Sequence, residues 1–320
     1  MSVSTHWSGH AAATKAGGDG IAQAFIGKLP PANPLTSDLS DGTMQTVSMQ
    51  CSWGGELTAS VSADYDTAAH VSLFIPGFTG SKEDFLGFLP HLIAQTKPSE
   101  SRAFVAYSQR GQADSARPQG DYDYALEDFV NDAQEVLMRL GAERRPIDVL
   151  GHSFGGVVAR RLSIACPSLV RSLTLLSSGA KPIAETPQSR AGMQAIRDHG
   201  SSIIFTSKNP GATDEPQDDP YLEMFRQRAH RTSVENLLSI ASILTDYDDV
   251  TDSLKATGIP ISIMFGENDP VWPHAVYREE ARRLAVTPIV FPGAGHSAQL
   301  DVPDALAKAL SSFWFKNRGQ

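Results

Sequence analysis

The sequence contains little of what marks several common classes of protein. Its 320 residues include two cysteines, Cys51 and Cys166, and neither has a cysteine or histidine neighbour at the spacing of zinc ligands. We therefore expect neither a disulfide framework nor a structural metal site. No stretch approaches the roughly 18 uninterrupted apolar residues of a membrane span, and the first residues lack the charged start and apolar run of a signal peptide. A cytoplasmic protein without a membrane span is expected.

Positive charge is also scarce. The 27 lysines and arginines are outnumbered by 36 aspartates and glutamates, which gives a formal net charge of -9. Binding to nucleic-acid phosphates needs clustered basic side chains that displace counterions, so DNA or RNA is not an expected partner. Three arginine pairs, Arg144-Arg145, Arg160-Arg161 and Arg282-Arg283, are predicted to be solvated helix ends or faces.

The order of apolar segments predicts an α/β fold. Residues 1–42 are rich in Ala, Gly, Ser and Pro without an apolar period, which predicts a mobile extension. Residues 47–51 and 57–61 alternate in polarity around two glycines and are predicted to form a β-hairpin. From His70 onward apolar runs alternate with helical segments, as in a mostly parallel sheet covered by helices on both faces. The predicted strands are residues 71–75, 102–107, 147–151, 172–177, 261–266 and 288–291.

One helical insertion interrupts this alternation, at residues 181–247, and divides the predicted core into residues 43–180 and 248–320. Three segments there have helical patterns, and the last is preceded by the capping-box pattern Thr232-x-x-Glu235. The acidic, proline-containing stretch at 209–220 is predicted to be an exposed loop; its carboxylates could bind Ca²⁺, but the prolines break any ordered ligand spacing. The predicted helices are residues 189–200, 220–230 and 234–247 in the insertion, and 84–95, 124–142, 155–165, 274–285 and 304–315 in the core.

A glycine-flanked motif surrounds Ser153. Residues 151–155 read Gly-His-Ser-Phe-Gly between a predicted strand and a predicted helix. At such a turn a serine hydroxyl is exposed, and the helix N-terminus presents free N–H groups to negative charge. The motif is short, so a passive serine in a glycine-rich turn is the alternative. Its place between a strand and a helix favours a catalytic nucleophile.

Two further candidates follow later strands. Asp269 and His296 each come just after a predicted strand, and the carboxyl ends of parallel strands meet in one crevice. We therefore expect them to converge with Ser153. His296 would take the serine proton as general base, while Asp269 would fix the imidazole tautomer. Glu267 and Asp301 are rivals for the orienting role.

The predicted oxyanion donors are backbone N–H groups. One belongs to Phe154, immediately after the serine, and the other to Phe78 in the glycine-containing loop after the 71–75 strand. Phe78, Phe154, Val271 and Trp272 also suggest a largely apolar pocket, and Val271 and Trp272 are predicted to contact the substrate. Packing in the core is the alternative for each of these side chains.

Taken together, these motifs resemble the capped members of the α/β-hydrolase family, over roughly residues 51–316. The resemblance implies a helical cap at 181–247 and an open sheet beneath it. Pro76-Gly77 stands where many members have His-Gly, which keeps the backbone donor. Arg110 lies in residues 108–115, which keep the arginine and first glycine of a family motif but lack its aspartate and second glycine. Arg110 is therefore interpreted as structural. The loop Thr79-Gly80-Ser81 resembles that of a lyase of the family. Those lyases usually have arginine where this chain has Val157, so the lyase interpretation is weakened.

The predicted function is that of a cofactor-independent serine hydrolase. It would cleave a carboxylic ester, or a related acyl or carbon–carbon bond, of a small and largely apolar substrate through an acyl-enzyme. Two alternatives remain open at the level of sequence. One is a ligand-binding or signalling protein that turns over slowly. The other is cofactor-free perhydrolase or lyase chemistry at the same three residues.

Overall fold

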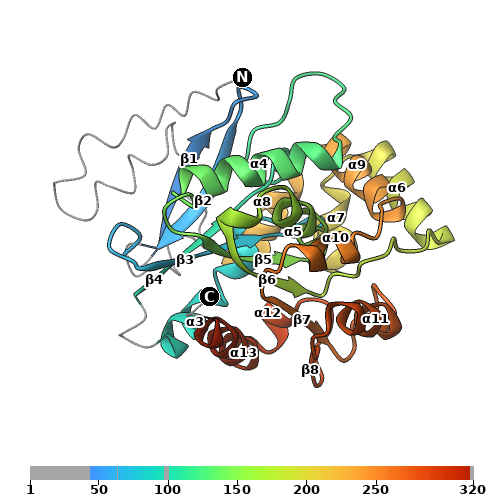
Figure 1. The fold of residues 1–320 in the computed structure, drawn as a ribbon. Helices are drawn as coiled ribbons and strands as arrows, with labels where there is room; N and C mark the ends of the chain where they lie inside the picture. Colours follow the sequence, from blue (N-terminus) through green and yellow to red (C-terminus); the bar gives the residue numbers. More distant parts are fainter. Residues whose placement is uncertain (1–43, 63, 97–100, 318–320) are drawn as a thin grey trace.

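The computed structural model describes residues 44–62, 64–96 and 101–317 (Figure 1). The extension predicted at residues 1–42 lies outside the described residues. The described chain forms an eight-stranded sheet in the order β1-β2-β4-β3-β5-β6-β7-β8. The strands are β1 (Met44–Gln50), β2 (Glu56–Ser62), β3 (His70–Ile75), β4 (Arg102–Tyr107), β5 (Ile147–His152), β6 (Val170–Leu176), β7 (Ile261–Gly266) and β8 (Ile289–Phe291).

The pairing of the strands confirms the predicted α/β fold. β1 and β2 form an antiparallel hairpin in which Val47 lies opposite Ala59, and β2 pairs antiparallel with β4. Every other neighbouring pair is parallel. The carboxyl ends of β3, β5, β6, β7 and β8 therefore lie at one edge of the sheet, where side chains from distant segments can converge.

Helices cover both faces of the sheet. Figure 1 shows α4 (Leu126–Arg139) and α5 (Phe154–Ala165) above the sheet and α3 (Leu89–Gln95) and α13 (Pro303–Lys316) below it. Successive side chains along a strand point to opposite faces of the sheet. Leu73 packs on the face covered by α4 and α5, and Phe74 packs on the face covered by α3 and α13. Because both faces are covered, the central strands are buried along nearly their whole length, and polar residues such as Ser72 and Asp148 are buried with the apolar ones.

The segment predicted as one helix at 84–95 is divided in two. A 3₁₀ turn, η1 (Lys82–Phe85), is followed by an irregular stretch and then by α3. Pro90 lies in the first turn of α3. A proline has no N–H to donate and its ring clashes with the carbonyl four residues earlier, so it starts a helix but does not continue one.

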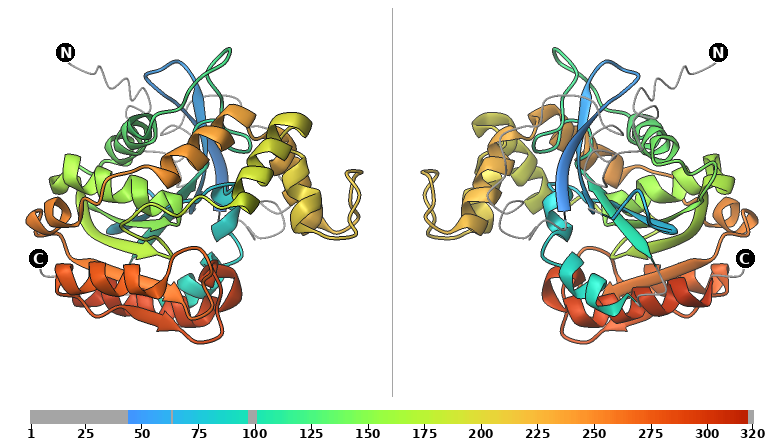
Figure 2. Two further views of the ribbon diagram at one scale, coloured as in Figure 1. Left: turned by 90° about the vertical axis from the view of Figure 1, so that its right-hand side faces the viewer. Right: turned by 90° about the vertical axis from the view of Figure 1, so that its left-hand side faces the viewer.

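Helices fill the chain between β6 and β7, where the sequence predicts the insertion. Their bounds are α6 (Pro187–His199), α7 (Ile203–Lys208), α8 (Pro220–Arg231), α9 (Val234–Thr245) and α10 (Thr251–Ala256). The yellow segment that contains the first three of them projects to one side of the sheet in Figure 2, whereas the last packs against the core helix α5 (Phe154–Ala165). α7 and α10 were not predicted, because six residues are too few to show a helical period. The predicted capping box is wrong by one residue: Ser233 caps α9 by accepting a hydrogen bond from the Asn236 N–H (3.1 Å), and Thr232 ends α8.

Candidate active site

Ser153 lies at the turn between β5 and α5, at the carboxyl edge of the sheet. Its backbone has φ 55° and ψ -120°, a conformation that L-residues rarely adopt and that costs about 1–3 kcal/mol. Two hydrogen bonds hold it there: the Ser153 N–H donates to Leu176 (2.9 Å), and the Gly156 N–H donates to the Ser153 carbonyl (2.9 Å). The strained turn places the side chain in the wall of a cavity instead of in the core.

The glycines that flank Ser153 allow segments of backbone to approach each other. A Cβ atom on Gly151 would lie 2.3 Å from the Gly155 carbonyl oxygen. A Cβ atom on Gly155 would lie 2.2 Å from the carbonyl oxygen of Ile75, the last residue of β3. Since neither contact is sterically possible, the turn requires glycine at both positions.

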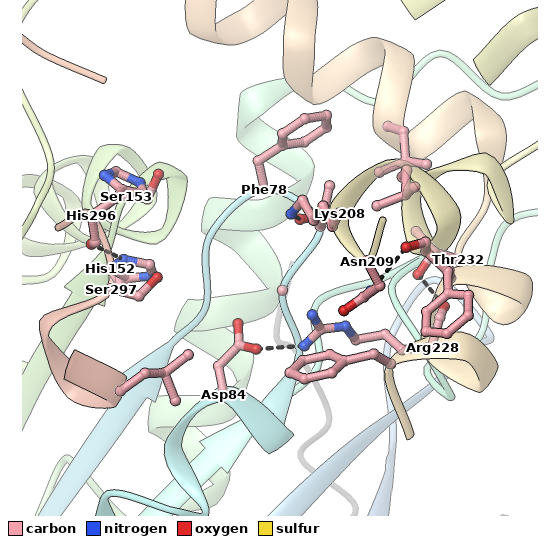
Figure 3. Close-up of a pocket in the computed structure, with 18 of the residues that line it drawn as sticks. Phe78, Asp84, His152, Ser153, Lys208, Asn209, Arg228, Thr232, His296 and Ser297 are labelled. Carbon is pink, nitrogen blue, oxygen red and sulfur yellow. Dashed lines mark hydrogen bonds and ion pairs between the residues drawn. The ribbon is translucent and has the colours of Figure 1, made fainter. Parts of the chain in front are cut away.

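His296 and Asp269 contact each other. The Nδ1 atom of His296 lies 2.9 Å from Asp269 Oδ1. A carboxylate can only accept, so Nδ1 carries the proton and Nε2 is left with its lone pair. His296 lines the same cavity as Ser153, and Figure 3 shows both labelled side chains at one end of it. The structure thus brings together the three residues that the sequence selected.

The Asp269 carboxylate is buried and accepts further hydrogen bonds. The Tyr277 hydroxyl donates to Oδ2 (2.6 Å), and the Val271 N–H donates to Oδ1 (3.0 Å). Burial by itself raises the pKa of Asp269. The hydrogen bond and the charge of His296 oppose this effect, as do the hydrogen bonds from Tyr277 and the Val271 N–H, and the pKa stays below its ordinary value. The aspartate is therefore ionised at neutral pH. Tyr277 was not predicted, because nothing in the sequence distinguishes it from a core tyrosine.

The two rival carboxylates face other groups. Glu267 accepts a hydrogen bond from the Gly293 N–H (2.9 Å), and Asp301 accepts one from the Gly295 N–H (2.8 Å). Both brace the loop that leads to His296. Within the described residues these two carboxylates bond to backbone groups, and Asp269 is the carboxylate that contacts the imidazole.

The loop after β3 passes close to Ser153. A Cβ atom on Gly77 would lie 2.9 Å from the Ser153 Cβ, which explains the glycine before Phe78. Two buried glutamines hold the loop from behind: the side-chain amide of Gln109 donates to the Pro76 carbonyl (3.0 Å), and that of Gln112 donates to the Gly77 carbonyl (3.0 Å). Neither glutamine was predicted to have this role, because no local sequence pattern marks it. Fixing these carbonyls also fixes the direction of the N–H groups that follow them.

His152, the residue before Ser153, supports the loop of His296. Its Nε2 lies 2.9 Å from the His296 carbonyl oxygen and therefore donates, since a carbonyl only accepts. Burial, with a smaller effect from His296, lowers the pKa of His152 to about 4. His152 is thus neutral at physiological pH. Its Nδ1 has no hydrogen-bond partner among the described residues.

The cavity that contains Ser153 and His296 has a volume of about 290 Å³. Phe78 is part of its wall, whereas Phe154 is buried edge-to-face against Phe129. Val271 and Trp272, predicted to contact the substrate, do not line this cavity. The apolar wall is formed mainly by the insertion, by Ile204, Phe205, Phe225, Ala229 and Leu237, together with Leu300 of α12 (Ala298–Asp301).

Trp272 is buried in the core, so the prediction that it contacts the substrate is wrong. It is 1% exposed, and its indole N–H donates to the Lys181 carbonyl (2.8 Å). Its ring centroid lies 6.1 Å from that of His296, so it packs behind the imidazole. The sequence placed Trp272 near the site correctly but could not show which way the ring points.

Two buried arginines have structural roles around the site. Arg160 was predicted to be solvated but is buried, and its Nε donates to Glu280 on α11 (His274–Leu284) at 2.8 Å. This ion pair joins α5, which follows Ser153, to the helix that carries Tyr277. Arg110 forms two bonds of 2.6 Å with Asp132, in agreement with its interpretation as structural.

The described segments contain neither a cluster of metal ligands nor a helix suited to a membrane. No group of three or more His, Cys, Asp or Glu side chains within them could hold a metal ion. Cys51 and Cys166 are both buried and free. No helix of the described chain combines the length and apolar character that crossing a membrane requires.

Known proteins resemble this chain in sequence and in fold. The chain is 24% identical over 268 residues to the sn-1-specific diacylglycerol lipase ABHD11 of Mus musculus, across 78% of this chain and 82% of the mouse protein. A carboxylesterase structure from the thaumarchaeon Nitrososphaera gargenis matches with a TM-score of 0.70 at 18% identity, over 85% of this chain and 98% of that one. A thermophilic esterase from Thermogutta terrifontis matches with a TM-score of 0.67 at 20% identity, over 85% and 99% of the two chains.

The model of the alpha/beta hydrolase family matches residues 73–309, which is more than half of the chain. The matched region includes the turn at Ser153 and extends past His296. This chain therefore belongs to the alpha/beta hydrolase family.

Proposed function

We propose that the protein is a serine hydrolase that cleaves carboxylic esters. The observation that carries this proposal is the contact between His296 Nδ1 and Asp269 (2.9 Å), with Ser153 in the wall of the same cavity. The contact leaves His296 Nε2 as a base, and the turn of positive φ places Ser153 in the wall of the cavity that His296 also lines.

The reaction would proceed in two halves. Ser153 Oγ attacks the ester carbonyl carbon while His296 Nε2 takes its proton, and Asp269 stabilises the imidazolium. The N–H groups of Phe78 and Phe154 would receive the oxyanion, and the alcohol leaves with the proton from His296. Water, deprotonated by His296, then attacks the acyl-enzyme and releases the acid. No cofactor or metal ion is needed for these steps.

The helices α6 to α9 would act as the cap over this site. Ile204, Phe205 and Phe225 from this segment line the cavity, which favours a substrate with an apolar part. The mouse relative is a lipase and two structural neighbours are esterases, and these names support an ester as the bond that is cleaved.

Hydrolysis of p-nitrophenyl esters of short and long acids tests the proposal. We expect Ser153→Ala and His296→Ala each to lower kcat by about 10³-fold or more, because both remove a group that reacts. Ser168→Ala is the matched control, since Ser168 is exposed and does not line the cavity. Full activity in Ser153→Ala would overturn the mechanism.

A second pair of variants tests the acid. Asp269→Asn should lower kcat by up to about 10⁴-fold, because an amide can force the wrong imidazole tautomer. Glu267→Gln should have a much smaller effect, since Glu267 bonds the Gly293 N–H. A larger loss in Glu267→Gln would reassign the orienting role.

A further inference from the structure

Two cations line the part of the cavity that lies away from Ser153. Lys208 ends α7 and Arg228 lies on α8, and both side chains line the same cavity as Ser153 and His296. Figure 3 shows them on the opposite side of this cavity from Ser153 and His296. The site therefore has a reacting end and a cationic end.

The charges at the cationic end do not balance. Arg228 forms an ion pair with Asp84, which also lines the cavity. Lys208 donates to the neutral hydroxyl of Thr79 (2.8 Å) and has no carboxylate of the described residues within ion-pair distance. The exposed Lys208 therefore leaves one positive charge in the cavity wall without a carboxylate partner among the described residues, within a chain of net charge -9.

The surroundings of Lys208 make a bound anion favourable. Although Lys208 retains solvent-exposed surface, loss of hydration in the cavity wall and the charge of Arg228 lower its pKa, with a smaller opposing effect from Asp84. An ammonium has three N–H donors, and Thr79 accepts one. An anionic oxygen could accept another, in a charge-assisted hydrogen bond that also offsets the repulsion by Arg228.

We propose that the substrate is an ester that also carries a carboxylate or phosphate group, which binds Lys208. This rests on the proposed function and specifies its substrate class. Ser153 acts on the ester bond at one end of the cavity, and the apolar wall contacts the intervening chain. The anion lies at the other end, against Lys208, with Arg228 nearby.

A purely structural role for Lys208 makes a different prediction. Its bond to Thr79 joins α7 to the residue after Phe78, a proposed oxyanion donor. If Lys208 served only as this link, its loss would affect neutral and anionic esters alike. If it binds the anion, the loss falls on anionic esters and is mainly in KM.

The test uses esters matched in acyl length. Mono-p-nitrophenyl esters of glutaric, adipic and suberic acids are compared with the p-nitrophenyl esters of pentanoic, hexanoic and octanoic acids. Monoacylglycerol 3-phosphates are compared with monoacylglycerols, which places the anion on the alcohol side and makes it a phosphate. We expect at least one anionic series to have the higher kcat/KM in the wild type. Lys208→Gln should lower that preference about tenfold, the value of one charge-assisted hydrogen bond.

Controls separate this proposal from the hydrolase mechanism. Lys208→Arg should retain the preference, and Lys255→Gln, an exposed lysine on α10, should not change it. Calorimetric titration of mono-p-nitrophenyl glutarate and monoacylglycerol 3-phosphate into Ser153→Ala, with and without Lys208→Gln, tests binding without turnover. At least one should bind about tenfold more weakly when Lys208 is lost. An unchanged preference together with unchanged binding would overturn the proposal, even if hydrolysis of neutral esters depends on Ser153. Independence from Ser153 would overturn the hydrolase mechanism instead.

Discussion

His152 Nε2 donates a hydrogen bond to the backbone carbonyl of His296 across 2.9 Å. The residue before the proposed nucleophile thereby holds the loop that carries the proposed base. The two segments are 144 residues apart in sequence, and they come together because β5 and β8 end at the same edge of the sheet. His152 must be neutral to fit this buried position, and its pKa of about 4 meets that requirement.

This neutrality makes the stability depend on pH. The native pKa of about 4 lies below the ordinary value of 6.5, so between these pH values the unfolded chain binds a proton that the native protein does not. The contribution of neutral His152 is complete above pH 6.5 and is lost as the pH falls toward 4. Between pH 7 and pH 5 it amounts to about 2 kcal/mol. Urea unfolding of wild type and His152→Gln at both pH values measures it.

The glutamine variant should lose less stability over this interval, by about that amount, since its side chain does not titrate. Equal losses in the two proteins would show that His152 is not protonated on unfolding in this range. His230→Gln is a control, because His230 is far more exposed and lies in the insertion.

Loss of the buried amide of Gln112 should impair catalysis more than binding. Gln112→Met removes the donor to the Gly77 carbonyl, and leaving such a group unsatisfied costs about 1–3 kcal/mol. The loop of Phe78 can then relax, so we expect kcat to fall about tenfold with a smaller change in KM. Steady-state kinetics with a p-nitrophenyl ester measures both constants. Gln95→Met, at an exposed position at the end of α3, should match the wild type; an unchanged kcat in Gln112→Met would contradict the role of the loop.

Much of this arrangement could be predicted from the sequence, for identifiable reasons. Ser153, Asp269 and His296 follow strands whose apolar runs are easily recognised, and parallel strands bring their ends together. The supporting residues are different. Gln109, Gln112 and Tyr277 act through hydrogen bonds that depend on side-chain direction in three dimensions. A local sequence pattern does not show in which direction such a side chain points.

Two errors have the same physical origin. Arg160 belongs to a basic pair that looks solvated, but its partner Glu280 is 120 residues away in sequence and follows the insertion. Trp272 follows the predicted catalytic Asp269 closely in sequence, yet its ring is turned inward against Gly179, where an added Cβ would lie 2.4 Å from the indole. Long-range packing decides both positions.

Tyr277→Phe should weaken the support of Asp269 without abolishing activity. The carboxylate loses the 2.6 Å bond from the tyrosine hydroxyl but keeps its contacts with His296 and the Val271 N–H. The pKa of Asp269 should rise, because one donor that stabilises its charged form is gone. We expect a three- to tenfold loss in kcat, about the effect of one hydrogen bond, and activity lost at a higher pH on the acid side of the kcat/KM profile. Tyr221→Phe, at an exposed tyrosine, is the control; matching profiles would contradict this role.

The central claim is that Ser153 is the nucleophile, and covalent labelling tests it most directly. The intact protein is treated with a fluorophosphonate, and the modified peptide is identified by mass spectrometry. We predict stoichiometric modification of Ser153, about 10³-fold slower modification in His296→Ala because the base is lost, and parallel loss of ester hydrolysis. Label on another residue, or full ester hydrolysis by protein fully labelled at Ser153, would contradict the account.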